Sequence, residues 1–258
     1  MKNHIKNQTA LITGATSGIG RQIAIDLAAM KVNLILLGRD KTKLKKLKKI
    51  LSKQSKREIS TYTLDVRDRE SVEKTMKKIL KKQTVDILVN SAGLALGIEK
   101  IDEGIIDNWD AMIDTNLKGL LYISKPVIAQ MRPLETAHII NIGSVAGKTT
   151  YPGGNVYCAT KAAVHSLGES INADLISTNI KVTTIAPGAV NTNFSATRFE
   201  GDKKKADTVY DGYTPLNAKD ISATVISVLN TPKHVNIQYL DIMPTAQRNP
   251  YLIHKNKD

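Results

Sequence analysis

Three side chains in the second half of the chain have the types and spacing needed to move a proton to or from a substrate oxygen. Tyr157 and Lys161 form a Y-x-x-x-K pair, and residues four apart on a helix lie on one face. A lysine ammonium group would favour the phenolate form of tyrosine, whose free pKa of about 10 is too high for a base near neutrality. Ser144, just past an apolar run that ends at Ile142, would hydrogen-bond the substrate oxygen. Taken alone, the Tyr–Lys pair also fits two solvent-exposed residues on a helix surface.

A glycine-rich turn near the N-terminus offers a place for a phosphorylated cofactor. Thr13 to Gly20 reads Thr-Gly-Ala-Thr-Ser-Gly-Ile-Gly and joins an expected strand to an expected helix. Glycines let the backbone approach a pyrophosphate, and the helix N-terminus then presents free N–H groups and the positive end of its dipole. The G-x-x-x-G-x-G spacing differs from the commonest dinucleotide fingerprint, so an ordinary flexible turn is the alternative.

The end of the second expected strand indicates which cofactor the turn would hold. An acidic residue there would bind the ribose 2′-hydroxyl of NAD and repel a 2′-phosphate. Leu37 is followed instead by Gly38 and Arg39, and arginine can bind a phosphate through its forked guanidinium. We place Asp40 at the start of the next helix, where a carboxylate caps backbone N–H groups. The sequence therefore predicts NADP rather than NAD, although Arg39 also fits a surface arginine paired with Asp40.

Strand and helix patterns alternate along the chain. The expected strands are Thr9–Thr13, Val32–Leu37, Ser60–Leu64, Asp86–Asn90, His138–Ile142, Lys181–Ile185 and Gln238–Ile242. The expected helices include Arg21–Met30, Arg69–Lys82 and Tyr157–Ile176, with further helical segments around Trp109 and Leu120. Such alternation predicts one α/β domain over residues 1–258, a Rossmann-type doubly wound parallel sheet flanked by helices on both faces. Residues 189–215 break the alternation, and we expect them to cover the substrate.

The bulk composition narrows the class of protein. The chain has 258 residues, of which 41% are hydrophobic, so a sizeable core can form. The sequence has no uncharged apolar run of about 18 residues, so we expect no membrane helix. The polar segment Met1–Gln8 lacks the apolar centre of a signal peptide. Cys158 is the single cysteine, which excludes an intrachain disulfide and a zinc cluster and fits a reducing cytoplasm. We expect a cytoplasmic protein with no bound metal.

The net charge of +13 is concentrated in two segments. Residues 41–57 carry nine lysines and arginines, and Lys77, Lys78, Lys81 and Lys82 form a second group. Leu44, Leu47, Ile50 and Leu51 run through the first segment at helical spacing, which predicts an amphipathic helix with a solvated lysine face. A nucleic-acid surface is the lesser alternative, because aromatic residues are few and no nucleic-acid module is visible. We therefore expect neither a nucleic-acid nor a membrane partner.

In their order along nearly the whole chain, these motifs resemble the short-chain dehydrogenase/reductase family. The family's T-G-x-x-x-G-x-G turn is matched by Thr13–Gly20, and its N-N-A-G segment by Asn90–Gly93, where Ser91 departs from the pattern. Its catalytic residues are matched by Asn116, Ser144, Tyr157 and Lys161. The resemblance implies an enzyme, an oxidoreductase that passes a hydride between a nicotinamide dinucleotide and a CH–OH group.

The resemblance also implies a role for each matched residue. Asn116 would hold a water in a proton relay to Lys161, and Lys161 would also bind the nicotinamide ribose. The residues expected to contact NADP are Gly14, Thr16, Ser17, Gly18, Ile19, Gly20, Arg39, Asp65, Val66, Asn90, Ala92, Gly93, Tyr157, Lys161, Pro187, Gly188, Val190 and Thr192.

Further segments resemble the NADP-dependent serine and 3-hydroxy acid dehydrogenase branch of this family. They include Tyr151–Tyr157, Arg198–Asp202 and Met243–Thr245, with Glu200 in place of an expected basic residue. The resemblance implies a small 3-hydroxy acid, or its carbonyl counterpart, as substrate and a homotetrameric assembly. We expect Ser144 to contact this substrate and hypothesise that Arg198 binds its carboxylate bidentately. A surface arginine paired with Glu200 or Asp202 is the alternative.

Two other functions fit parts of the sequence. A 3-ketoacyl-thioester reductase, or another short-chain carbonyl reductase, would use the same catalytic residues, and a basic surface would suit an acidic carrier protein. A dinucleotide-sensing binding protein could share the fold without catalysis, but such a protein is expected to lack one of Ser144, Tyr157 and Lys161, and all three are present.

Overall fold

A seven-stranded parallel sheet forms the centre of the computed structural model, which describes residues 3–199, 201–202, 204 and 208–256. The strand order is β3-β2-β1-β4-β5-β6-β9. Its strands are β1 (Thr9–Ile12), β2 (Asn33–Gly38), β3 (Ile59–Thr63), β4 (Ile87–Asn90), β5 (Ala137–Ile142), β6 (Ile180–Pro187) and β9 (Tyr239–Ile242). The order reverses between β1 and β4, and open α/β sheets bind ligands at the carboxyl edge of such a switch point.

Helices connect the strands and cover both faces of the sheet. They are α1 (Gly18–Ala29), α2 (Lys41–Gln54), α3 (Arg69–Leu80), α4 (Ile106–Ile113), α5 (Gly119–Met131), α6 (Asn155–Asp174), α7 (Asn193–Arg198) and α9 (Ala218–Leu229). One wide π-helical turn (Asp114–Lys118) joins α4 to α5, and a 3-10 turn (Val145–Gly147) follows β5. Two short strands, β7 (Val190–Asn191) and β8 (Leu216–Asn217), pair separately.

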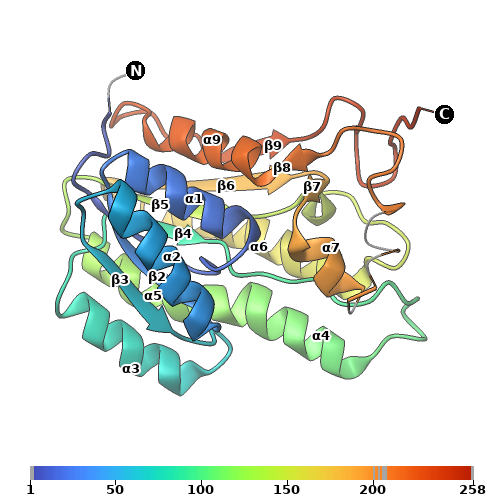
Figure 1. Cartoon of the computed structure of the whole chain (residues 1–258), viewed down its shortest axis with the longest axis horizontal. Coiled ribbons are helices and arrows are strands. Elements are labelled where there is room, and N and C mark those ends of the chain that lie inside the picture. Colours follow the sequence, from blue (N-terminus) through green and yellow to red (C-terminus); the bar gives the residue numbers. More distant parts are fainter. Residues whose placement is uncertain (1–2, 200, 203, 205–207, 257–258) are drawn as a thin grey trace.

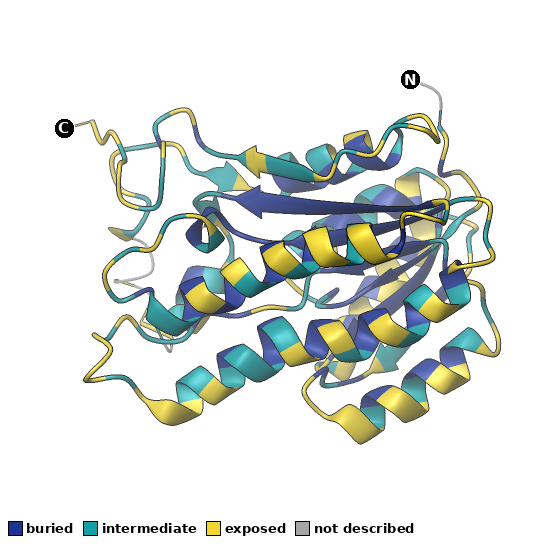
Figure 2. Ribbon diagram, turned by 180° about the vertical axis from the view of Figure 1, so that it is seen from behind, coloured by how far each residue is buried: buried dark blue, intermediate teal, exposed yellow. Residues whose placement is uncertain are grey.

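The sheet separates two hydrophobic cores. Side chains alternate across a strand, so Leu34 and Leu36 of β2 pack with α1, α2 and α9, whereas Ile35 and Leu37 pack with α3 and α5. Figure 1 shows α1 and α2 in front of the sheet. Seen from behind, the strands are buried while the covering helices expose their outer faces (Figure 2). The expected doubly wound parallel sheet is therefore confirmed.

The structure differs from the sequence-based prediction in two elements. Helix α9 was not predicted, although Ile221, Val225 and Val228 recur at helical spacing and are buried on one face of the helix. A capping box formed by Asn217 and Asp220 marks its start, and that pattern is visible in the sequence. In α2, Leu44, Leu47 and Leu51 are buried as predicted, but Ile50 is 40% exposed, because its place on the helix turns it away from the core.

Among the described residues, no helix is long and apolar enough to span a membrane.

Candidate active site

The glycine turn lies against the end of β4 at the switch point of the sheet. Gly14 has a φ of +65°, and a Cβ on it would lie 2.9 Å from the Cα of Ala92. A Cβ on Gly20 would lie 2.6 Å from the carbonyl oxygen of Gly14. The N-cap Ser17 makes no side-chain capping bond to α1, and the first turn of α1 has no acidic residue. The helix therefore keeps its free N–H groups and positive dipole end for an anion.

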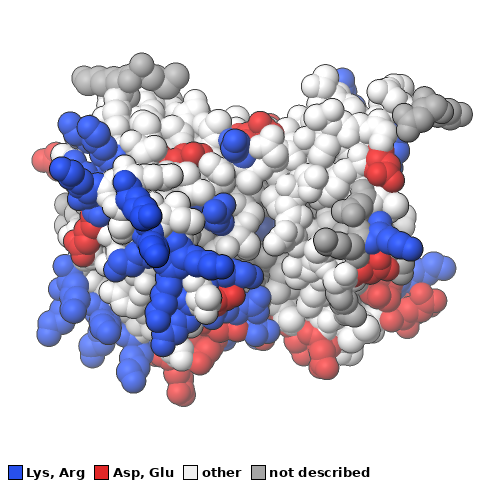
Figure 3. All heavy atoms as spheres, viewed as in Figure 1, with Lys and Arg blue, Asp and Glu red and all other residues white. Residues whose placement is uncertain are grey.

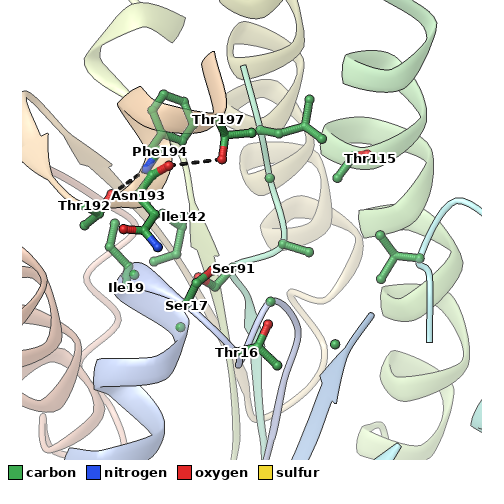
Figure 4. A pocket seen from close by; sticks show the side chains of 18 of the residues that line it. Thr16, Ser17, Ile19, Ser91, Thr115, Ile142, Thr192, Asn193, Phe194 and Thr197 are labelled. Carbon is green, nitrogen blue, oxygen red and sulfur yellow. Dashed lines mark hydrogen bonds between the residues drawn. The ribbon is translucent and has the colours of Figure 1, made fainter. Parts of the chain in front are cut away.

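A cavity of about 520 Å³ opens above this turn. Figure 4 shows Thr16, Ser17 and Ile19 on one side and Phe194 with Thr197 on another. The predicted site residues in its wall are Gly14, Thr16, Ser17, Gly18, Ile19, Gly20, Arg39, Asp65, Val66, Ala92, Gly93, Ser144, Tyr157, Lys161, Pro187, Gly188, Val190 and Thr192. Asn90, Asn116 and Arg198 lie outside that wall.

One end of the cavity is basic. Gly38 lies so close to the turn that a Cβ on it would be 2.8 Å from Thr16 Cγ2, and Arg39 is exposed beside it at the rim. Asp40 is the N-cap of α2, and its Oδ1 accepts a hydrogen bond from the Lys43 backbone at 2.9 Å. The predicted capping role of Asp40 is confirmed. Lys43, which the sequence analysis did not identify, also lines the cavity; its place one helical turn after Arg39 was the available signal.

Two polar residues of the predicted cofactor site are held by neighbouring side chains. Asp65 forms a bidentate ion pair with Arg67, with Nη2 to Oδ2 at 2.7 Å, and this hydrogen-bonded guanidinium lowers the pKa of Asp65. Asn90 is buried, and its Nδ2 donates to Ser124 Oγ at 3.0 Å and to Asn141 Oδ1 at 2.9 Å. We expected Asn90 to contact NADP, but its side chain lies outside the cavity wall. The amide instead links β4 to β5 and α5.

The candidate catalytic residues meet at the carboxyl edge of β5. Ser144 follows β5, and its Oγ accepts a hydrogen bond from the Ala146 backbone at 3.2 Å, which caps the 3-10 turn. Tyr157 and Lys161 lie one turn apart on α6, and both are buried. The Lys161 ammonium group donates to the carbonyl oxygen of Ile142 at 2.8 Å. Ser144, Tyr157 and Lys161 all face the same cavity.

Burial shifts the pKa values of both α6 groups towards their neutral forms. Desolvation raises the pKa of Tyr157, while its hydrogen bond with Ser144 acts in the opposite direction. Desolvation also lowers the pKa of Lys161 to about 8. The expected lowering of the tyrosine pKa by Lys161 is therefore not the dominant effect in the protein alone, because the loss of water around the phenolate outweighs it.

Asn116 is buried in the π turn between α4 and α5. Its Oδ1 accepts from the Leu94 backbone N–H at 2.9 Å, and its Nδ2 donates to the Leu94 carbonyl at 2.9 Å and to Thr160 Oγ1 at 3.0 Å. The side chain thus ties the segment after β4 to the residue beside Lys161 on α6. These bonds use both Nδ2 hydrogens, so the side chain positions its neighbours, and the expected water relay stays a prediction.

Helix α7 forms the wall that faces the catalytic residues. Phe194 and Thr197 line the cavity (Figure 4), and the Phe194 ring centroid lies 5.7 Å from that of Tyr157. Hydrogen bonds from Phe194 N to Thr192 Oγ1 and from Thr197 Oγ1 to Asn193 O hold the first turn of α7. The region 189–215 therefore holds β7 and α7 as regular elements rather than a plain loop.

Arg198, at the end of α7, is held against the α6 side of the site. Its Nε donates to the Gly97 carbonyl at 3.1 Å and its Nη1 to Tyr151 Oη at 2.6 Å. The guanidinium carbon lies 5.3 Å from the Tyr151 ring centroid and 5.8 Å from that of Tyr157. Glu200, one of the two alternative partners considered for Arg198, lies outside the described residues. Arg198 is thus next to the candidate acid/base residue but behind the cavity wall.

Comparison with known proteins agrees with this geometry. A family model described as short chain dehydrogenase matches residues 8–203. This chain belongs to the short-chain dehydrogenase family. A Salmonella typhi protein named NADP-dependent 3-hydroxy acid dehydrogenase YdfG is 42% identical over 239 residues, 92% of this chain and 95% of that protein. Sulfoacetaldehyde reductase 2 of Chromohalobacter salexigens is 39% identical over 241 residues, 92% of this chain and 94% of that protein.

A solved structure extends the similarity to three dimensions. The closed form of serine dehydrogenase complexed with NADP⁺ has a TM-score of 0.90 and 39% identity, covering 97% of this chain and 100% of that chain. In the described part of the present chain, no cluster of His, Cys, Asp and Glu side chains could hold a metal ion.

Proposed function

We propose that this chain is an NADP-dependent oxidoreductase that passes a hydride between the cofactor and a small 3-hydroxy acid or its carbonyl counterpart. The observation that carries the proposal is that Ser144, Tyr157 and Lys161 face one cavity that continues over the glycine turn to a basic rim. The names of the relatives and of the NADP⁺-bound serine dehydrogenase support the same cofactor and substrate class.

The residues of the cavity fit a phosphorylated dinucleotide. A Cβ at Gly14, Gly20 or Gly38 would collide with its protein neighbours, so glycine lets the turn pack closely against the ends of β2 and β4. The uncapped start of α1 suits a pyrophosphate. Arg39 and Lys43 would hold a 2′-phosphate at the basic rim. When bound, NADP gives or accepts the hydride.

The chain's own residues then handle the proton. During reduction of a carbonyl group, Tyr157 donates its phenolic proton to the substrate oxygen, and during oxidation it accepts the alcohol proton. Ser144 hydrogen-bonds the same oxygen and stabilises the charge that develops on it. Burial raises the tyrosine pKa, and the Ser144 hydroxyl and the charge of Arg198 oppose this rise. The positive charge of an oxidised nicotinamide would add to them, together with Lys161 one helical turn away.

The relatives' names suggest an acid group on the substrate. In a 3-hydroxy acid and in sulfoacetaldehyde, one carbon separates the acid group from the carbon that carries the oxygen. We propose that Arg198 recognises this acid group. Its guanidinium lies beside Tyr157 and donates to Gly97, Tyr151 and Gly153, which leaves further N–H groups, since arginine carries five. Because Arg198 lies behind the cavity wall, contact with the acid group requires α7 to shift when the substrate binds.

A cofactor and substrate survey tests the function. The purified protein should reduce NADP⁺ with serine or 3-hydroxypropionate, with a much higher kcat/KM for NADP⁺ than for NAD⁺. A 3-ketoacyl thioester with NADPH is the competing assay. Faster turnover of the thioester than of every 3-hydroxy acid would assign the chain to ketoacyl reduction, and binding of NADPH without turnover of any substrate would make it a sensor.

Two substitutions test Arg198. With a 3-hydroxy acid, Arg198→Ala should lower kcat/KM by roughly one hundredfold and Arg198→Lys by less, because only arginine binds a carboxylate bidentately. With an uncharged secondary alcohol, both variants should stay close to the unmodified protein. Arg248→Ala, which removes an exposed arginine bonded to the Thr245 carbonyl, is the control. Equal losses with both substrates would show that Arg198 only holds the wall formed by α7.

We also propose a homotetrameric, cytoplasmic protein, as the family resemblance implies. Exposed apolar side chains on α5 and near the C-terminus, Leu121, Tyr251 and Leu252, are surfaces that such an assembly could cover. Light scattering coupled to size-exclusion chromatography should give four times the 28.2 kDa chain mass. A monomer mass at micromolar concentration would contradict the assembly.

A further inference from the structure

A buried histidine lies directly beneath the turn that carries Ser144. His165 is on α6 and is 8% exposed. A Cβ on Gly143 would lie 2.6 Å from His165 Nε2, and a Cβ on Gly147 would lie 2.5 Å from His165 Cε1. Gly143 directly precedes Ser144, and Gly147 is the last residue of the 3-10 turn. The turn therefore folds around the imidazole ring, which only glycine at both places allows.

The hydrogen bonds of the ring determine which nitrogen carries the proton. The backbone N–H of Ser144 points to His165 Nε2 at 3.4 Å, and Tyr239 Oη lies 3.4 Å from His165 Nδ1. A backbone N–H can only donate, so Nε2 has to be the unprotonated nitrogen. In a neutral ring the proton is then on Nδ1 and is donated to Tyr239 Oη. The rings of His165 and Tyr239 also meet edge to face, with centroids 5.1 Å apart.

The contacts continue from Tyr239 back to the serine turn. Burial raises the pKa of Tyr239, and the carboxylate of Asp241, two residues further along β9, acts in the same direction. The carboxylate of Asp241 accepts from Lys148 Nζ at 2.6 Å, and this ammonium group also lies 4.0 Å from the Tyr239 ring centroid. Lys148 immediately follows the 3-10 turn. The turn is thus held from below by His165 and from its far end by Lys148.

The surroundings keep the imidazole in the form that can accept a hydrogen bond. Burial lowers the pKa of His165 to about 4, and the positive charges of Lys161 and Lys148 act in the same direction, whereas Asp241 and the Ser144 backbone oppose them. At neutral pH the ring is therefore uncharged, and Nε2 stays available to the Ser144 backbone. His165 has no role in the proton transfer assigned to Ser144, Tyr157 and Lys161.

We propose that His165 is a positioning residue that holds the backbone of Ser144, through Nε2, so that the serine hydroxyl meets the substrate oxygen beside Tyr157. Tyr157, Lys161 and His165 follow one another at four-residue spacing on α6 and so lie on one face. The helix that carries the proton donor thereby also supports the hydroxyl that acts with it. This inference rests on the proposed hydride-transfer function.

Substitution separates positioning from folding. His165→Leu fills a similar space but leaves the Ser144 N–H without its acceptor, so kcat should fall by about tenfold or more, since small misplacements of reacting groups are costly. The KM for NADP should change by less than about twofold, because the cofactor wall is untouched. His165→Gln, whose Oε1 can accept from Ser144, should recover most of the lost kcat.

The chain offers a matched control in a second buried histidine. His138 is 4% exposed and bonds Thr183 Oγ1 at 2.8 Å, near the other end of β5 from Ser144. His138→Leu should lower the unfolding midpoint in urea as His165→Leu does, yet retain kcat. If both leucine variants lose kcat equally, or if His165→Gln recovers none of it, His165 is only a packing residue and the proposal is wrong.

A measurement without turnover keeps this proposal separate from the proposed function. Nitrogen-15 chemical shifts of labelled histidine should show His165 protonated on Nδ1 and unprotonated on Nε2 between pH 6 and 8. A proton on Nε2 overturns the proposal even if the enzyme is active. If the unmodified protein turns over no substrate, the hydride-transfer function has failed, and the positioning of Ser144 for that reaction fails with it, whichever tautomer is found.

Discussion

At the scale of single residues, the site combines two groups that burial drives towards their neutral forms. Tyr157 and Lys161 are both enclosed by the protein, so the tyrosine pKa rises and the lysine pKa falls to about 8. A neutral phenol is the form that can donate a proton to a carbonyl oxygen. Oxidation needs the phenolate, which the charge of an oxidised nicotinamide stabilises. The two directions of the reaction therefore differ in the protonation state of Tyr157 from which they start.

Removing one oxygen atom tests this assignment. Tyr157→Phe keeps the ring that packs on Phe194 but has no proton to transfer, so kcat should fall by at least about one hundredfold. The dissociation constant for NADPH, measured by nucleotide fluorescence, should stay within about threefold. Near-normal turnover in this variant would contradict the role of Tyr157 as acid and base.

Cofactor choice is tested at the basic rim. Arg39→Ala removes a charge-assisted contact with a 2′-phosphate, so NADP should bind roughly ten- to a hundredfold more weakly, while NAD binding stays nearly unchanged. Isothermal titration with both cofactors measures the two effects. Arg132→Ala, on the chain segment that follows α5, is the control. A loss of the same size for both cofactors would mean that Arg39 binds something other than the 2′-phosphate.

At the scale of elements, the π turn between α4 and α5 is the piece of backbone that links the cofactor side to the catalytic helix. Its extra residue per turn brings Asn116 inward, where it bonds both backbone groups of Leu94 and the hydroxyl of Thr160. A Cβ on Gly93, the residue before Leu94, would lie 3.3 Å from Asn116 Oδ1 and 3.5 Å from Lys161 Nζ. These five residues therefore form one close-packed junction.

Truncating Asn116 should break this junction. Asn116→Ala leaves a buried N–H and a buried carbonyl of Leu94 without partners, which should lower the free energy of unfolding by at least about 2 kcal/mol. Urea unfolding followed by circular dichroism measures the change. Asn236→Ala, which removes an exposed amide bonded to Asn172, should change the stability by less than about 0.5 kcal/mol. Similar stabilities of the two variants would contradict the structural role of Asn116.

At the scale of the whole molecule, one region of the surface is densely covered by positive charge. Figure 3 shows lysine and arginine side chains crowded over the part of the surface where α2 and α3 lie. The lysines of α2 are exposed, and α2 begins at the basic rim of the cavity, where Lys43 contributes to the wall. NADP is a polyanion, and a positive field around the entrance of a site raises the rate of encounter with such a ligand. Attraction of NADP would therefore account for the exposed lysines of α2 without a nucleic-acid partner.

Stopped-flow binding of NADPH tests this steering. The association rate constant should fall as salt rises, because the Debye length shortens from about 30 Å at 0.01 M to about 8 Å at 0.15 M. Replacing Lys41, Lys45 and Lys46 with glutamine should lower the association rate several-fold at low salt and leave the dissociation rate unchanged. Replacing Lys77, Lys78 and Lys81, near the far end of α3, is the control. Equal association rates in the two triple variants would contradict steering by α2.

Local sequence patterns were enough to predict the class of fold and to bring most of the candidate site residues to one cavity. Strand-like apolar runs separated by helical patterns specify parallel strands with crossovers, since an alternating chain can bury its apolar faces in few other ways. Residues that follow those strands, such as Ser144 and the glycine turn, had to meet at the carboxyl edge of the sheet. The capping role of Asp40 was also predictable, because a cap depends on residues only three apart.

Features that depend on contacts between distant residues could not be predicted from local patterns. The side chain of Asn90 turned away from the cavity because Ser124 and Asn141, from other elements, provide its hydrogen bonds. Burial, rather than the neighbouring lysine, controls the pKa of Tyr157, since desolvation depends on everything packed around the ring. His165 has no motif, and its place beneath Ser144 follows from α6 packing across the end of β5. Local patterns specify elements, whereas side-chain environment arises from contacts between residues far apart in the sequence.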